Sequence, residues 1–230
     1  MARPERVGAA SHRPSRQSYD AIAASYDEAI GDELNSKPLD RALLAALVER
    51  CSGGVVADLG CGPGHVAAEL ARGGVVALGV DLSPGMCRRA LGRGVPSAAG
   101  DLVDLPLADS SLAGLVCWYA LIHLTEEERA VAYDEMARVL APGGTALVAF
   151  HTGDAEARPG DCRRLESWMG EPVELSFYFL DPAREIAAAE SAGLRLTARL
   201  DRLPAGGEHP STRSYLLLEL PEPPPSKSAA

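Results

Sequence analysis

Apolar and amphipathic stretches alternate along most of the 230-residue chain. Seven short apolar runs predict buried β-strands, at residues 55–59, 75–81, 95–99, 112–118, 146–151, 194–203 and 214–220. Amphipathic stretches predict helices, at residues 18–30, 37–51, 65–72, 125–140 and 182–192, with a further helix that starts at Pro84. Repeated alternation of strand and helix is typical of an α/β fold with a mostly parallel sheet and helices on both faces.

Capping residues support three of the predicted helix starts. Ser83-Pro84 combines an N-cap with a first helical residue, Thr125–Glu128 has the spacing of a capping box, and Asp181-Pro182 precedes the last helix. The last two strands have no helix between them. We therefore expect the last strand of the seven-stranded sheet to run antiparallel.

Both ends of the chain and one internal segment break this alternation. Residues 1–15 predict a flexible N-terminal segment and residues 221–230 (PEPPPSKSAA) a disordered tail, because neither can bury enough apolar surface to order itself. Residues 152–180 are rich in Gly, Pro and aromatic side chains, and we expect an irregular insertion there that covers a substrate. Residues 16–220 then form a single domain, for which the 47% apolar content supplies a core.

The turn after the first strand, in VVADLGCGPGHV, is rich in glycine. Gly60, Gly62 and Gly64 permit tight turning and let a ligand lie against the backbone, at the edge of an open α/β sheet where nucleotide-like ligands bind. A dinucleotide fingerprint needs a small residue at position 65, where this chain has His65. A phosphate-binding P-loop needs Gly-Lys-Ser/Thr, which is absent. Both of these ligand classes are disfavoured.

An acidic residue lies at or near the end of each of the first three predicted strands. Asp58 disfavours a pyrophosphate and suits a ligand with ammonium and sulfonium groups, or it orients the loop through backbone N–H groups. Asp81 ends the second strand, where a carboxylate can accept hydrogen bonds from two ribose hydroxyls or cap the next helix. Asp101 follows the third strand, where it can meet an adenine amino group or be solvated.

These segments resemble, in order and spacing, the core motifs of class I S-adenosyl-L-methionine (SAM)-dependent methyltransferases: DLGCGPG, GVDLSPGM, GDLVDLPLADSSLAGLVC and LAPGGTALVAF. The resemblance covers residues 18–150 and implies a Rossmann-like fold, SAM as cofactor and S-adenosyl-L-homocysteine as product. The implied cofactor-binding residues are Tyr26, Asp58, Gly60, Cys61, Gly62, Gly64, Asp81, Leu82, Met86, Asp101, Leu102 and Cys117. The segments WYALIHL, FHTGD and HPSTRSYLLLEL look like those of an actinobacterial subgroup that acts on small molecules.

The acceptor of the methyl group is expected beyond the ends of the fourth and fifth strands, under the N-terminal helix and the insertion. Methyl transfer from a sulfonium is an in-line displacement that needs a general base only when the acceptor must lose a proton. The candidate bases are His123 and His151, unless hydrogen bonds hold them in a structural role. The candidate substrate residues are Tyr19, Trp118, Tyr119, His123, Phe177, Tyr178 and Arg213.

The net charge of −10 argues against nucleic acid or an anionic membrane as a partner, because both bind clustered Lys and Arg. The five cysteines are scattered and form no CxxC pair, so we expect neither disulfides nor a metal site. No run approaches the roughly 20 apolar residues that span a bilayer, and the N-terminus lacks the apolar segment of a secretory signal. We expect a cytoplasmic monomer or homodimer with a small-molecule acceptor.

The expected function is transfer of a methyl group from SAM to O, N or C of a small metabolite, such as a natural product. One alternative is a nicotinamide oxidoreductase, against which His65 and Asp58 count. Another is a SAM-binding enzyme with non-methyl chemistry such as cyclisation. A third is a non-catalytic SAM-binding protein. Such a protein would be expected to have a damaged glycine loop or to lack the ribose carboxylate, and this sequence shows neither defect.

Overall fold

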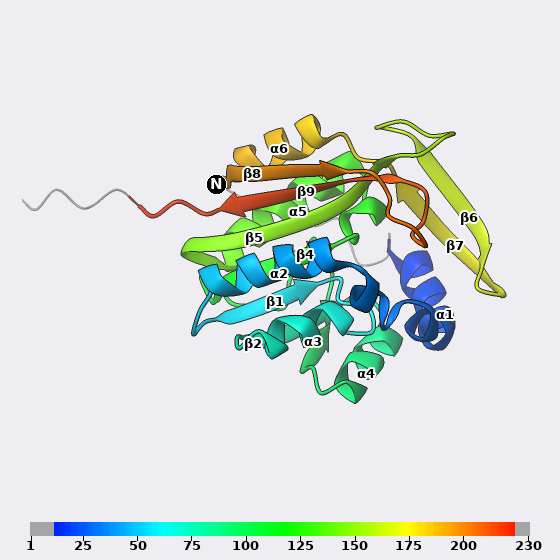
Figure 1. Cartoon of the computed structure of the whole chain (residues 1–230), viewed down its shortest axis with the longest axis horizontal. Helices are drawn as coiled ribbons and strands as arrows, with labels where there is room; N and C mark the ends of the chain where they lie inside the picture. Colours follow the sequence, from blue (N-terminus) through cyan, green and yellow to red (C-terminus); the bar gives the residue numbers. More distant parts are fainter. Residues whose placement is uncertain (1–11, 224–230) are drawn as a thin grey trace, which may run out of the picture.

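Seven strands form one mixed sheet in the computed structural model, which describes residues 12–223 (Figure 1). The strands are β1 (Val55–Leu59), β2 (Val76–Asp81), β3 (Ser97–Ala99), β4 (Leu112–Trp118), β5 (Leu140–Gly153), β8 (Arg195–Arg202) and β9 (Thr212–Glu219). Their order is β3-β2-β1-β4-β5-β9-β8. β9 runs antiparallel to both of its neighbours and the other pairs are parallel. The predicted fold class and the antiparallel last strand are confirmed.

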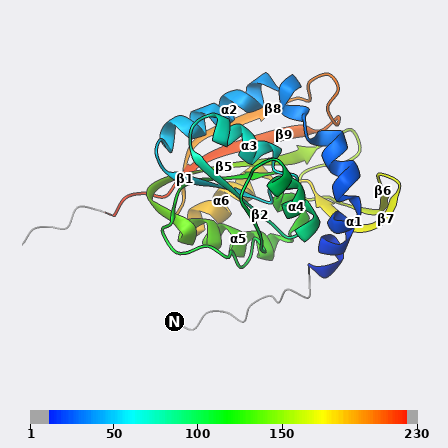
Figure 2. The same ribbon diagram turned by 90° about the horizontal axis from the view of Figure 1, so that it is seen from below.

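Helices cover both faces of this sheet (Figure 2). The helices are α1 (Arg13–Ile30), α2 (Pro38–Arg50), α3 (His65–Arg72), α4 (Pro84–Gly92), α5 (Glu126–Val139) and α6 (Pro182–Ser191), with 3₁₀ turns η1 (Glu33–Ser36) and η2 (Leu121–His123). The predicted caps are present: Ser83 Oγ accepts the N–H of Met86, and Thr125 and Glu128 form the capping box.

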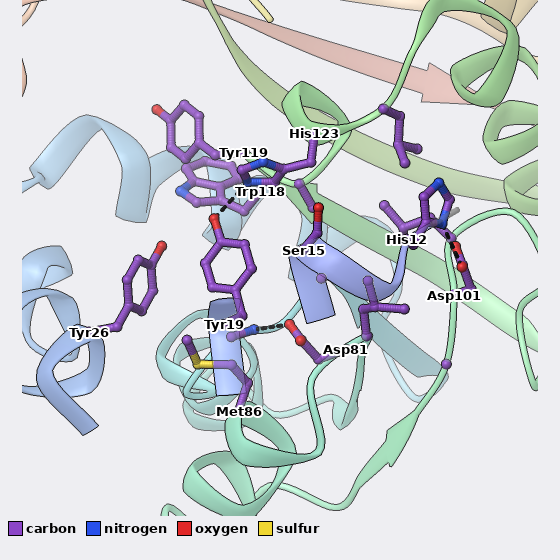
Figure 3. A pocket seen from close by; sticks show the side chains of 17 residues that line it. His12, Ser15, Tyr19, Tyr26, Asp81, Met86, Asp101, Trp118, Tyr119 and His123 are labelled. Carbon is purple, nitrogen blue, oxygen red and sulfur yellow. Dashed lines mark hydrogen bonds and ion pairs between the residues drawn. The ribbon is translucent and has the colours of Figure 1, made fainter. Parts of the chain in front are cut away.

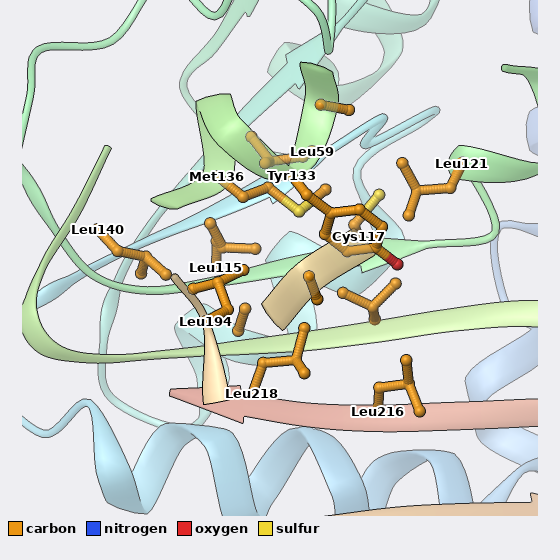
Figure 4. Packing of buried hydrophobic residues seen from close by; sticks show 14 of the residues in the cluster. Leu59, Leu115, Cys117, Leu121, Tyr133, Met136, Leu140, Leu194, Leu216 and Leu218 are labelled. Atoms are coloured by element: carbon orange, nitrogen blue, oxygen red, sulfur yellow. The ribbon is translucent and has the colours of Figure 1, made fainter. Parts of the chain in front are cut away.

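The core lies in two apolar layers, one on each face of the sheet. Tyr133 and Met136 of α5 pack with Leu115 of β4 and Leu218 of β9 in one layer (Figure 4). The other layer joins α2 and α3 to the opposite face, through Leu44, Leu47, Val66 and Leu70. A third, smaller cluster stands apart from both and contains Ile22, Val173 and Leu175.

The insertion expected to be irregular requires correction. β5 extends to Gly153, and β6 (Cys162–Trp168) pairs antiparallel with β7 (Glu171–Tyr178) to form a hairpin. Its turn residues Met169 and Gly170 both have positive φ, 52° and 83°, which suits a tight hairpin turn. A methionine at the first position is not a usual turn signal, so the hairpin was not predicted.

The N-terminal boundary also requires correction. α1 begins at Arg13, and His12 before it is only 8% exposed, although residues 1–15 were expected to be flexible. The order at this end comes from contacts with distant parts of the chain, described below. The rest of the predicted flexible segment, and the predicted tail from residue 224 onward, lie outside the described residues.

α1 and the hairpin together cover the edge of the sheet where β1, β2 and β4 end (Figures 1 and 2). Ser18 of α1 joins the two elements, because its Oγ accepts the N–H of Glu174 at 2.8 Å and donates to the carbonyl of the same residue at 3.4 Å. We call α1 and β6–β7 the roof. It places helix and hairpin side chains over the strand ends.

Candidate active site

The glycine turn between β1 and α3 needs glycine because its backbone has positive φ angles and packs closely against neighbouring residues. Gly60 and Gly62 have φ of 73° and 51°, a region that favours glycine, and a Cβ on Gly60 would lie 2.2 Å from the Cβ of Ala120. The Gly60 N–H donates to the carbonyl of Val80 at 2.7 Å, which ties the turn to the end of β2. The turn therefore presents bare backbone toward the space under α1.

Asp81 fixes the other side of this turn. Its Oδ2 accepts the N–H of Gly62 and its Oδ1 accepts the N–H of Ser83, both at 2.8 Å. Burial raises the pKa of Asp81 to about 6, so the carboxylate is ionised at neutral pH. Each oxygen retains acceptor capacity beyond its one backbone partner, which leaves room for hydroxyl donors from a ligand.

A cavity opens between the glycine turn and α1 (Figure 3). Among its lining residues are eight of the predicted cofactor-binding residues: Tyr26, Gly60, Gly62, Asp81, Leu82, Met86, Asp101 and Leu102. Trp118, predicted as a substrate residue, lines this first cavity instead of the one described below. The strand ends and the helix thus bring together residues spread from position 26 to 118.

Four predicted cofactor residues lie behind the wall of this cavity. Asp58 is 1% exposed and its Oδ2 accepts the N–H of Ala67 in the first turn of α3, at 3.1 Å. Cys61 and Cys117 point into the core, and Gly64 lies against Ala90 of α4. None of these four residues lines the first cavity, and for Asp58 the geometry favours the loop-orienting alternative.

α1 contributes residues that the sequence analysis missed. Asp20 Oδ1 accepts the hydroxyl of Ser83 at 2.6 Å and the N–H of Gly85 at 2.7 Å, which fastens α1 to the start of α4. His12 and Ser15 line the first cavity. The signal was the seven-residue spacing of Tyr19 and Tyr26: extending that helix face toward the N-terminus reaches Ser15 and then His12.

Tyr19 and His123 form a hydrogen-bonded pair at the base of the roof (Figure 3). Ser176 offers only a carbonyl to His123 Nδ1, at 3.0 Å, so Nδ1 carries the proton and Nε2 accepts from the Tyr19 hydroxyl at 2.7 Å. Burial lowers the pKa of His123 to about 4. The imidazole is therefore neutral at physiological pH and acts as an acceptor toward Tyr19.

A second cavity of about 650 Å³ adjoins the first. One wall is aromatic and comes largely from the roof, with Tyr19, Tyr26, Trp168, Phe177 and Tyr178. The polar part of the lining includes Lys37, His151, Glu208 and Arg213. Tyr19, Tyr26, Tyr119 and His123 line both cavities, so the two spaces meet at these four side chains.

His151 is held in place in the polar part of this lining. Its ring stacks on Tyr119 at 4.6 Å between centroids, and its Nδ1 lies 2.7 Å from the hydroxyl of Ser211. Burial, with the positive charge of Arg213, lowers the pKa of His151 to about 3. Tyr119 has φ of 58°, a strained conformation for a bulky residue, of the kind that clusters at functional sites.

The charges of the second cavity are compensated. Lys37 Nζ lies 2.7 Å from Glu33 Oε2, Arg213 lies 3.4 Å from Glu208, and Arg163 lies 2.9 Å from Asp154. No group of three or more His, Cys, Asp or Glu side chains among residues 12–223 is placed to hold a metal ion. Within the same residues, no helix is long and apolar enough to cross a membrane.

Residues 56–144 match the family model described as "Methyltransferase domain". The match spans the glycine turn, Asp81 and Asp101 and ends within β5. Residues 56–144 therefore belong to a methyltransferase domain. The structure of the CcbJ methyltransferase from Streptomyces caelestis shares this methyltransferase fold, with a TM-score of 0.69 and 22% identity over 89% of this chain and 98% of that chain.

Two curated methyltransferases are similar in sequence to this domain. The chain is 34% identical to malonyl-[acyl-carrier protein] O-methyltransferase of Herminiimonas arsenicoxydans over 156 residues. This aligned segment covers 67% of this chain and 55% of that protein. Over 133 residues it is 32% identical to demethylmenaquinone methyltransferase of Corynebacterium kroppenstedtii, with 56% of each covered. The chain spans little more than half of the length of either relative.

Proposed function

We propose that this protein transfers a methyl group from SAM to a small molecule, with SAM in the first cavity and the acceptor in the second. The observation that carries the proposal is the junction of the two cavities at Tyr19, Tyr26, Tyr119 and His123. An in-line displacement needs donor and acceptor side by side in a fixed alignment, and much of its acceleration comes from that alignment.

The donor set of the first cavity fits SAM. Asp81 would accept the ribose hydroxyls, Asp101 would accept the adenine amino group, and Leu82 and Met86 would flank the base. The bare backbone at Gly60 and Gly62 would lie against the methionine part, with Tyr26 close to Gly62. Bound SAM supplies an electrophilic methyl group on a sulfonium. The residues named here hold and orient that group.

The second cavity favours an uncharged acceptor that contains a ring. Its roof side offers aromatic faces and edges, which suit a flat apolar body. Its charged side chains are already paired with opposite charges, so a charged acceptor would have to compete with an existing ion pair. A natural product with a hydroxyl or amino group on a ring system has this character. O, N and C acceptors all remain within the proposal.

The Tyr19–His123 pair would orient the acceptor and receive its proton late in the reaction. Neutral His123 accepts the hydrogen bond of the Tyr19 hydroxyl, which leaves the lone pairs of the Tyr19 oxygen free to accept a hydrogen bond from the acceptor. With a pKa of about 4, His123 is too weak a base to ionise an alcohol before attack. The pair suits acceptors that are nucleophilic without prior deprotonation, whose proton becomes acidic as the new bond forms.

Isotope labelling tests the proposal directly. Purified protein is incubated with SAM that carries a labelled methyl group and with extract of the host strain that lacks this gene, and products are identified by mass spectrometry. A labelled small molecule supports methyl transfer and identifies the acceptor. Consumption of SAM without a labelled product would favour cyclisation or another non-methyl reaction. Failure to bind S-adenosyl-L-homocysteine would contradict the proposal altogether.

A cytoplasmic location and a monomeric or homodimeric state belong to the same proposal. A net charge of −10 supports solubility and disfavours nucleic acid as a partner. Sedimentation of the purified chain distinguishes the two states.

A further inference from the structure

His12 joins three elements that lie far apart in the sequence. It precedes α1, its Nδ1 lies 2.7 Å from Oδ2 of Asp101 in the loop after β3, and its Nε2 lies 2.9 Å from Oε1 of Glu128 in α5 (Figure 3 shows the first contact). All three side chains are at least 85% buried, with relative exposures of 9%, 15% and 12%. The contact closes the start of α1 over one end of the first cavity.

The hydrogen-bond chemistry fixes the protonation state of this histidine. An ionised carboxylate can only accept a hydrogen bond, so each ring nitrogen must donate one, and the ring is an imidazolium. The hydrogen bond with Asp101 and the negative charges of Asp101 and Glu128 outweigh burial and raise the pKa of His12 to about 9. The cation sits between two anions.

The same end of the cavity is the proposed adenine subsite. Gly100, Asp101 and Leu102 line it from the loop after β3, and His12 and Ser15 line it from α1. Asp101 Oδ1 also accepts the N–H of Val103 at 3.2 Å, so the orientation of its carboxylate is set from two sides. A carboxylate in this state offers acceptors alone toward the base.

We propose that His12 is a positioning residue for the adenine ring of the cofactor: its imidazolium donates to the Asp101 carboxylate, orients it at the adenine edge and fastens α1 over the base. The inference rests on the proposed binding of SAM in the first cavity. An acceptor-only carboxylate pairs with the 6-amino group of adenine and rejects a 6-oxo purine, because it would face a carbonyl oxygen without a proton between them. His12 thus supports both affinity and selectivity without contact to the reacting atoms.

The test is calorimetric titration of the full chain with S-adenosyl-L-homocysteine from about pH 7 to about pH 10, which brackets the ordinary and the shifted pKa. Affinity should be constant near neutrality and fall about tenfold as the pH passes about 9, because neutral imidazole cannot donate to both carboxylates. His12→Gln should bind more weakly at neutral pH and show a smaller fall in affinity near pH 9, since glutamine does not titrate and only the ligand's own α-amino group then loses a proton.

Glu128→Gln sharpens the assignment. Glutamine preserves the capping box but removes one of the two negative charges that raise the pKa of His12, so the loss of affinity should begin at lower pH. Gln17→Ala, at an exposed position of α1 outside both cavities, is the matched control and should retain the profile of the unmodified chain. Thermal unfolding of each variant verifies that it is folded at each pH.

A 6-oxo analogue of S-adenosyl-L-homocysteine tests the selectivity. The unmodified chain should bind it at least about tenfold more weakly, and Asp101→Asn should reduce that difference because an amide can also donate. Equal affinity of His12→Gln and the unmodified chain, or a flat pH profile of the unmodified chain, would overturn the role of His12 while leaving SAM binding intact. Tighter binding by His12→Gln would overturn it too, since His12 would then compete with adenine. If the unmodified chain does not bind S-adenosyl-L-homocysteine at any pH, the proposed function fails and this inference fails with it.

Discussion

Single side chains in this site act through hydrogen bonds whose direction is set by their partners. Ser176 can only accept, which makes His123 an acceptor toward Tyr19. The backbone N–H groups of Gly62 and Ser83 can only donate, which keeps Asp81 ionised despite its burial. Substitutions that preserve shape but change the donor pattern are therefore the most informative.

Asp81→Asn should weaken binding of S-adenosyl-L-homocysteine roughly 10- to 100-fold, the range for loss of hydrogen bonds to a charged group of about 1.5–3 kcal/mol. Lowering the pH through about 6 should weaken binding by the unmodified chain, because a protonated Asp81 loses acceptor capacity. Calorimetry at pH values above and below 6 measures both. Asp109→Asn, with a side chain 78% exposed, should change nothing. Unchanged affinity of Asp81→Asn would remove Asp81 from the ribose site.

Tyr19→Phe should lower kcat about tenfold or more while the affinity for S-adenosyl-L-homocysteine stays within about twofold, because the ring is retained and only the hydroxyl is lost. The acceptor found by labelling provides the assay. Since Tyr19 and His123 act as a pair, the double variant with His123→Phe should be no slower than the slower single variant. Additive losses would show that the two side chains act separately.

At the scale of elements, the roof is built as a unit separate from the main core. Ile22 of α1 and Val173 and Leu175 of β7 form their own cluster, with Tyr19, Tyr26 and Trp168 packed against it. The buried residues of this cluster belong to neither layer of the core, so a local opening of the roof would leave both layers in place. Both cavities lie under the roof, so its opening would admit cofactor and acceptor together.

Leu175→Ala should loosen α1 and the hairpin at the same time. Truncating this buried leucine removes about 2–5 kcal/mol of packing stability, and the lost contacts are those of the roof cluster, not those of the sheet. Hydrogen exchange should become faster in both α1 and β6–β7 and stay unchanged in β1, β4 and β5. Leu203→Ala is the control, because Leu203 is 75% exposed. Faster exchange in the hairpin with α1 still protected would contradict a common roof.

At the scale of the whole molecule, the fold carries buried carboxyl groups at some cost in stability. Asp58 is fully buried beneath the glycine turn, with one oxygen on the Ala67 N–H and Oδ1 without a hydrogen-bond partner in the described residues. Burial raises its pKa from 3.8 to about 8. The folded chain therefore retains a proton on Asp58 that the unfolded chain has lost between these two pH values.

The sign of the resulting pH dependence follows from this raised pKa. Stability contributed by protonated Asp58 is complete below about pH 4 and is lost as the pH rises through about 8. The side chain of the Asp58→Asn variant does not titrate, so its free energy of unfolding lacks this decrease. From about pH 4 to about pH 8, the free energy of unfolding of the unmodified chain should therefore fall relative to that of the variant by on the order of 2–5 kcal/mol, at about 1.4 kcal/mol per pKa unit. Chemical denaturation at several pH values measures the difference. A difference that is independent of pH would mean that Asp58 is ionised in the folded chain.

The sequence by itself determined the layered α/β fold, the glycine turn and the acidic strand ends. These features are local: a strand is recognised by its apolar run, Gly60 and Gly62 by a backbone that needs positive φ, and Asp81 by its place at a strand end. The order of strands and helices along the chain then brings the carboxyl ends of β1, β2 and β4 to one edge. That is why eight of the residues that line the first cavity could be named in advance as cofactor-binding residues.

Only the tertiary structure decided which side chains face that cavity and what covers it. Asp58, Cys61 and Cys117 share the motif with the lining residues, but the pleat and the turn direct them into the core. His12 meets Asp101 across 89 residues, and Ser18 meets Glu174 across 156. Contacts at such separations depend on where the sheet places its edges, which no local pattern encodes. The hairpin and the first turn of α1 owe their order to these contacts.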